Sequence, residues 1–233
     1  MTCELPGGAI FLHIPKTGGT WVFEVLTELG LVKRTVGRHP HADYTRAVFY
    51  PNHKARWKEW EGVSQGGLFN RGSTMKFPFT FCFVRHPAMW YVSWWRYLTG
   101  GRFQADVTAM SNADNYMKRW HPNTVATRAF DNDFSTFVRN VHKAFPGYVT
   151  WMYNLYAPPE ISFVGKQETL TDDLIAVLGK LNITADETRI RNWPRSNESK
   201  QKAEAKWDTG LLAEVQAAEL AGIKRFGYEV LEK

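Results

Sequence analysis

The fold is decided by residues 9–21, which read Ala9-Ile10-Phe11-Leu12-His13-Ile14-Pro15-Lys16-Thr17-Gly18-Gly19-Thr20-Trp21. The stretch opens on a short, nearly continuous apolar run, which is typical of a strand buried on both faces. After a turn with two glycines, apolar residues recur at helical spacing as far as Gly30: Trp21, Val22, Val25, Leu26 and Leu29. The pattern predicts a buried strand, a loop and a helix.

The same succession occurs twice more along the chain. Residues 79–84 form a second apolar run, followed by a helix that begins near Pro87, a residue suited to the first helical position, and ends before Gly100. Residues 161–164 form the third run, followed by a helix with Thr171 as its expected N-cap. Three strand–helix units predict an α/β fold in three layers, with a central parallel sheet flanked by helices.

The rest of the chain is predicted to complete a single domain, residues 1–233, with a helical insertion at approximately residues 101–160. An amphipathic helix is expected at Phe134–Phe145, and another from Trp207 to Phe226 with Asp208 or Thr209 near its start. Two polar, basic and weakly periodic segments, residues 34–72 and 189–206, are expected to form loops over a site.

Composition narrows the class of protein. The 233 residues carry a net charge of +6, which favours an anionic partner without identifying it. The two cysteines, Cys3 and Cys82, are too few for a disulfide framework or a zinc cluster. No apolar run approaches the length that spans a bilayer, so we expect a soluble, cytoplasmic chain with no membrane span.

The loop Pro15–Thr20 has the chemistry of an anion site. It lies between a buried strand and a helix N-terminus, where free N–H groups, the helix dipole, two hydroxyls and a lysine converge. It is not a Walker A loop, because Lys16 precedes Gly18 and Gly19 instead of following them. The sequence therefore predicts a phosphate or sulfate site of another kind.

A second anion site is predicted after the second strand. Arg85 comes at the end of that strand, and Ser93 lies about two turns inside the following helix. Parallel strands bring their carboxyl ends to one edge of the sheet, where ligands bind in open α/β folds. A guanidinium and a hydroxyl at that edge suit a second phosphate.

Two motifs resemble those of sulfotransferases that use 3'-phosphoadenosine 5'-phosphosulfate (PAPS). They are His13-Ile14-Pro15-Lys16-Thr17-Gly18-Gly19-Thr20-Trp21, and Arg85-His86-Pro87 followed by Val92-Ser93-Trp94-Trp95-Arg96. The form HIPKTGGT is similar to the enzymes that sulfate heparan sulfate at the 6-O position. The resemblance implies the P-loop NTPase-like sulfotransferase fold, PAPS as donor, 3',5'-bisphosphoadenosine (PAP) as product, and no metal. Because the chain lacks the N-terminal anchor of the Golgi enzymes, it resembles a compact soluble member of bacterial or viral type.

Roles for particular residues follow from this resemblance alone. Lys16 would contact the bridging oxygen of the donor, and Thr17, Gly18, Gly19 and Thr20 would hold the 5'-phosphosulfate. Trp21 would stack on adenine, while Arg85 and Ser93 would bind the 3'-phosphate. The segment Arg195–Ser199 is similar to a loop that closes over the cofactor, which implies roles for Arg195, Asn197 and Ser199.

The transfer also needs a base for the proton of the acceptor hydroxyl. The stretch His41-Ala42-Asp43-Tyr44-Thr45 resembles the region that holds the catalytic histidine of the 6-O enzymes, so His41 is the first candidate, His39 the second and His53 a distant third. The acceptor is expected to be a glycan or a small molecule that carries a hydroxyl group.

Two other functions stay open at this point. One is a nucleotide or small-molecule kinase with a variant phosphate loop, against which stand the missing Walker lysine and the lack of a clear strand-end Asp for magnesium. The other is a basic nucleic-acid-binding protein. Lys and Arg are spread along the chain among Asp and Glu instead of clustering with aromatic residues, so no nucleic-acid partner is expected.

Overall fold

The computed structural model describes residues 1–37, 40–49, 78–100, 124–196 and 204–232. Its framework is a five-stranded mixed sheet with the strand order β3-β1-β2-β4-β5. The strands are β1 (Cys3–Glu4), β2 (Ile10–Leu12), β3 (Arg34–Thr35), β4 (Thr80–Val84) and β5 (Phe163–Lys166). The protein is therefore of the α/β class, as the sequence predicts.

The predicted parallel sheet is confirmed for its central strands only, because the sheet as a whole is mixed. β2, β4 and β5 are parallel, and they are the strands of the three predicted units, but β1 runs antiparallel to both β2 and β3. A short 3-10 turn, Pro6–Gly8, reverses the chain, and the N–H of Leu5 donates to the carbonyl of Ala9 at 2.7 Å. Strands of two residues carry no apolar periodicity, so β1 and β3 escape a sequence pattern that depends on it.

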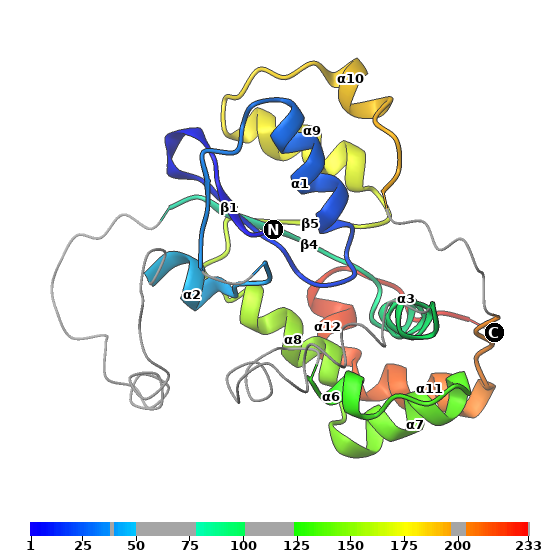
Figure 1. The fold of residues 1–233 in the computed structure, drawn as a ribbon. Helices are drawn as coiled ribbons and strands as arrows, with labels where there is room; N and C mark the ends of the chain where they lie inside the picture. The colour runs from blue at the N-terminus through cyan, green and yellow to red at the C-terminus, as the bar shows by residue number, and fades with distance from the viewer. Residues whose placement is uncertain (38–39, 50–77, 101–123, 197–203, 233) are drawn as a thin grey trace, which may run out of the picture.

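Helices cover both faces of the sheet (Figure 1). One face carries α1 (Gly19–Glu28), α9 (Leu170–Lys180) and α10 (Glu187–Arg191). On the other side lie α2 (Tyr44–Phe49), α3 (Pro87–Thr99), α6 (Thr124–Arg128), α7 (Phe134–Ala144), α8 (Tyr148–Tyr156), α11 (Thr209–Ala218) and α12 (Leu220–Arg225). The three-layer arrangement agrees with the prediction.

Two hydrophobic clusters follow from the alternation of side chains along the strands. Phe11, Phe81 and Phe83 point toward α1 and α9 and pack with apolar residues of those helices. Cys82 and Val84 point the other way, into a larger cluster formed with α3, α7, α8 and α11. The central strands are buried on both faces, which explains their continuous apolar runs.

Two details of the predicted helices changed. Thr171 is not an N-cap, because α9 begins one residue earlier, at Leu170. The C-terminal helix begins at Thr209 with Asp208 as its cap, whose carboxylate accepts from the N–H of Leu211 at 2.9 Å, but it divides at Glu219 into α11 and α12. Glu219 is fully buried and accepts hydrogen bonds from the main-chain N–H groups of Val149 (3.0 Å) and Thr150 (2.7 Å) at the start of α8.

Candidate anion-binding site

The candidate site lies where three adjacent parallel strands end. β2 leads into residues 13–18, here called the lysine loop, and β4 leads into Arg85 and His86, here called the arginine turn. β5 leads into residues 167–169, and the N–H of Gln167 donates to the carbonyl of Val84 at 2.7 Å. Both motifs therefore meet at the sheet edge where α/β folds bind ligands.

Contacts to main-chain atoms fix the lysine loop. The hydroxyl of Thr17 donates to the carbonyl of Ile14 at 3.0 Å, and the indole N–H of Trp90 on α3 donates to the carbonyl of Pro15 at 2.9 Å. Lys16 has a φ of 66°, which lies in the left-handed region. For residues other than glycine this conformation is less favourable than the right-handed one by about 1–2 kcal/mol. Strain of this kind persists where the surrounding structure determines the backbone, as these two hydrogen bonds do here.

The two glycines of the motif are required by packing. Gly18 has a φ of 84°, and a Cβ atom there would lie 2.5 Å from Cδ2 of Leu170. A Cβ atom on Gly19 would lie 2.1 Å from Cδ2 of His13, whose ring is buried behind the start of α1. Leu170 and His13 therefore close the space on the Cβ side of both residues.

The start of α1 offers main-chain donors to an anion. Gly18 is the N-cap residue, and among the residues that the structure describes no side chain caps this end. The first N–H groups of a helix have no partner within it, and the helix dipole adds positive potential. Lys16 lies beside them with its ammonium 4.4 Å from the ring centroid of Tyr97 on α3.

The arginine turn is held by Tyr153 of α8. Its hydroxyl accepts from the N–H of Arg85 at 3.2 Å and donates to the carbonyl of Arg85 at 2.9 Å. One phenol therefore satisfies both main-chain groups of Arg85. This contact fixes the backbone from which the guanidinium projects.

Within the part of the chain that the structure describes, the half-buried guanidinium of Arg85 has no ion-pair partner. Its Nε is buried without a hydrogen-bond partner, and none of the salt bridges among the described residues includes it. Burial lowers the pKa of Arg85 below its ordinary value, although Tyr153 and Glu168 act in the opposite direction. Arginine keeps its proton regardless, so the site holds a desolvated positive charge that an anion would stabilise.

Ser93 lies on the partly exposed stripe of α3. The stripe consists of Met89, Ser93, Arg96 and Tyr97, four residues with helical spacing on a helix that is otherwise mostly buried. Tyr97 is in contact with Lys16, and Arg96 is close enough to Arg85 to lower its pKa. This face of α3 therefore borders both the lysine loop and the arginine turn.

His41 reaches the site through His13. The two rings lie 4.4 Å apart, and Nδ1 of His41 is 3.0 Å from the carbonyl oxygen of His13. Since a carbonyl can only accept, Nδ1 is the donor, and the neutral ring then carries its lone pair on Nε2. The main-chain carbonyl of His41 accepts from the hydroxyl of Tyr156 at 2.8 Å, which anchors the residue to α8.

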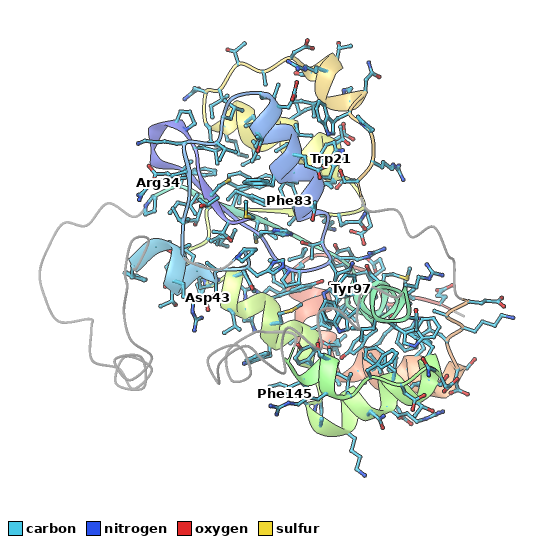
Figure 2. The ribbon with its side chains drawn as sticks, in the orientation of Figure 1. Trp21, Arg34, Asp43, Phe83, Tyr97 and Phe145 are labelled. Carbon is cyan, nitrogen blue, oxygen red and sulfur yellow. The ribbon has the colours of Figure 1, made fainter. Side chains whose placement is uncertain are left out.

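The remaining candidates are dispersed. Thr20 is exposed in the first turn of α1. Trp21 is only 7% exposed and lies between α1 and the sheet, on the same side as Phe83 (Figure 2), so it presents no broad face to a ligand. Arg195 is exposed, beside Ser196, whose hydroxyl contacts Glu24 of α1. Four predicted residues lie outside the described part of the chain: His39, His53, Asn197 and Ser199.

Several residues of the site were missed from the sequence. Tyr153 and Tyr228 lie far from both motifs along the chain, and no local pattern distinguishes them from other buried aromatic residues. Tyr97 has a signal, since it follows Ser93 by one helical turn and shares its face. Glu168 also has one, because it follows the third strand at the same sheet edge as Arg85.

The structure thus defines an α/β protein with two cationic half-sites at one sheet edge. Comparison with protein families, with curated proteins and with solved structures found no match for this chain. Within the described residues, no helix is long and apolar enough to cross a membrane. The same residues contain no cluster of side chains suited to holding a metal ion.

Proposed function

We propose that the protein is a sulfotransferase with the P-loop NTPase-like fold of that family, and that it transfers the sulfuryl group of PAPS to an acceptor hydroxyl. The proposal rests on the placement of Lys16, at the start of α1, and of Arg85 after adjacent parallel strands. Among the described residues no side chain caps that start of α1, and no ion pair includes Arg85. Two anion-binding half-sites side by side suit a nucleotide with phosphates at both ends of its ribose.

The residues present fit this donor. The main-chain N–H groups at the start of α1 would bind the 5'-phosphosulfate, with Thr17 shaping the loop through its bond to Ile14. The guanidinium of Arg85 and the hydroxyl of Ser93 would bind the 3'-phosphate. In this assignment the 3'-phosphate supplies the ion-pair partner that the guanidinium of Arg85 lacks among the described residues.

The donor supplies an activated sulfuryl group, whose bond to the bridging phosphate oxygen breaks as the acceptor oxygen bonds to sulfur. Lys16 would stabilise the negative charge on the departing oxygen. His41 would take the proton of the acceptor hydroxyl on Nε2, because its Nδ1–H already donates to the carbonyl of His13. The acceptor is predicted to be a glycan or small molecule that carries a hydroxyl group.

Calorimetry with PAP, and separately with ATP and magnesium, tests the donor. We expect the wild type to bind PAP. Arg85→Ala should lower the affinity for PAP roughly ten- to a hundredfold, because a charge-assisted hydrogen bond contributes about 1.5–3 kcal/mol. Lys180→Ala is the matched control, since Lys180 is exposed at the far end of α9, about 15 Å along the helix from Leu170. Preference for ATP with magnesium would contradict the proposal and favour a kinase.

The base is tested separately from the donor site. In a screen of glycan and small-molecule acceptors with labelled PAPS, we expect His41→Ala to lose turnover while its affinity for PAP stays at the wild-type value. Unchanged turnover would exclude His41 as the base. Loss of PAP affinity in this variant would instead assign His41 to the structure of the lysine loop.

A further inference from the structure

A glutamate lies beside the one guanidinium that the proposed donor site needs. Glu168 follows β5 at the same sheet edge as Arg85, and it is close enough to raise the pKa of that guanidinium. Yet the two side chains form no ion pair. An ion pair between them would occupy the charge that an anionic ligand requires.

Other partners hold both oxygens of Glu168. The main-chain N–H of His86 donates to Oε1 at 3.1 Å, and the hydroxyl of Tyr228 donates to Oε2 at 2.8 Å. Burial and the neighbouring Glu168 raise the pKa of Tyr228 above its ordinary range, so its phenol keeps the proton that it donates. The carboxylate is therefore oriented by one main-chain donor and one side-chain donor.

The position of Tyr228 is set by the end of α12. Gly227 adopts a left-handed φ of 63°, the N–H of Gly227 donates to the carbonyl of Lys224, and the N–H of Tyr228 donates to the carbonyl of Ile223 at 2.9 Å. These are the two hydrogen bonds of a Schellman motif, which reverses the chain sharply after a helix.

Two side chains then fasten the reversed segment to the sheet edge. Nζ of Lys166 donates to the carbonyl of Gly227 at 2.6 Å and lies 4.6 Å from the ring centroid of Tyr228. Nε2 of His86 donates to the carbonyl of Glu229 at 3.0 Å. The phenol of Tyr228 is thus held beside Glu168 by contacts to both neighbouring strand ends.

We infer that Tyr228 is a positioning residue that keeps Arg85 available to an anionic ligand, by holding the carboxylate of Glu168 in a hydrogen bond of its own. This inference deepens the proposed function and rests on it for the identity of the ligand. The geometry assigns the C-terminal segment to the 3'-phosphate half of the site, although 143 residues separate Tyr228 from Arg85 along the chain.

A double-mutant cycle tests the inference with PAP as the probe. Tyr228→Phe removes only the hydroxyl, which frees Oε2 of Glu168 to pair with Arg85. We expect PAP to bind about fivefold more weakly, the size of one partly exposed ion pair. In the Glu168→Gln background the carboxylate held by Tyr228 is gone, so the same change is expected to have no effect.

The outcomes separate this inference from the proposed function. An equal loss of PAP affinity on Tyr228→Phe in both backgrounds would mean that Tyr228 has only a structural role, and it would overturn the inference. Unchanged PAP affinity in the single variant Tyr228→Phe would also overturn it. Wild-type protein that binds no PAP would overturn the proposed function. In that case a crystal structure of Tyr228→Phe decides the inference without a ligand, because it must show Glu168 paired with Arg85.

Discussion

The lysine loop and the arginine turn occupy the same sheet edge but are built in different ways. The lysine loop takes much of its shape from nearby residues, since Thr17 bonds back to Ile14 and His13 packs against Gly19, and one distant residue, Trp90, adds a hydrogen bond to Pro15. The arginine turn takes its shape from distant segments, because Tyr153, Glu168 and the C-terminal residues 227–229 all hold it. One half-site is local in sequence and the other is assembled by the tertiary fold.

The difference predicts how each half-site fails. Disturbing the lysine loop is expected to require a steric change within its own motif or loss of the hydrogen bond from Trp90. The arginine turn is sensitive to single hydroxyl groups far along the chain.

Gly19→Ala should be the most damaging change. Its Cβ would lie 2.1 Å from the buried ring of His13, and overpacking of this kind destabilises a protein by about 1–3 kcal/mol. We expect chemical denaturation to give a lower free energy of unfolding for Gly19→Ala than for the wild type, because the His13 ring and the start of α1 must separate. PAP should also bind this variant more weakly.

The matched control is Gly179→Ala, near the end of α9. A Cβ there meets nothing within 4 Å, and alanine favours a helix over glycine by roughly 0.5–1 kcal/mol. This variant should be as stable as the wild type or more stable, with unchanged PAP affinity. Equal destabilisation by both substitutions would show that the lysine loop has no special steric requirement.

Two tyrosines of α8 allow the half-sites to be compared with one chemical change. Tyr153→Phe removes the hydroxyl that satisfies both main-chain groups of Arg85, and a buried polar group without a partner is destabilising by about 1–3 kcal/mol. We expect weaker PAP binding in calorimetry and a lower free energy of unfolding.

Tyr156→Phe is the counterpart beside the candidate base His41. Its hydroxyl donates to the carbonyl of His41, so the change should lower turnover several-fold and leave PAP affinity unchanged. If the two variants weakened PAP binding equally, Tyr156 would support the donor site and not only the position of His41.

The same division explains what could be predicted from the sequence. The three strand–helix units and the position of the lysine loop could be predicted because each is encoded by one contiguous stretch of the sequence. The strands β1 and β3 were missed because a strand of two residues is too short to show a periodic pattern of apolar residues. Tyr153 and Tyr228 were missed because only the fold brings them to Arg85, and a buried tyrosine has no local signal that separates a site residue from a core residue.

The smallest expected effect concerns pH and the cap of α3. Nδ1 of His86 accepts from the N–H of Ala88 at 3.2 Å, and Nε2 donates to the carbonyl of Glu229 at 3.0 Å, an arrangement that only the neutral ring can make. Burial lowers the pKa of His86 below its ordinary value. The unfolded chain therefore takes up the proton first as the pH falls.

The sign of the pH effect follows from this order of protonation. The contribution of His86 to stability is present above about pH 6.5, the ordinary value for histidine, and is lost as the pH falls below it. We expect the free energy of unfolding, measured by denaturation at pH 8 and pH 5.5, to fall less in His86→Asn than in the wild type. Asparagine can cap the helix at either pH because it does not titrate. The same decrease in both proteins would mean that another group titrates, and the C-terminal segment would then be held to the arginine turn independently of the charge on His86.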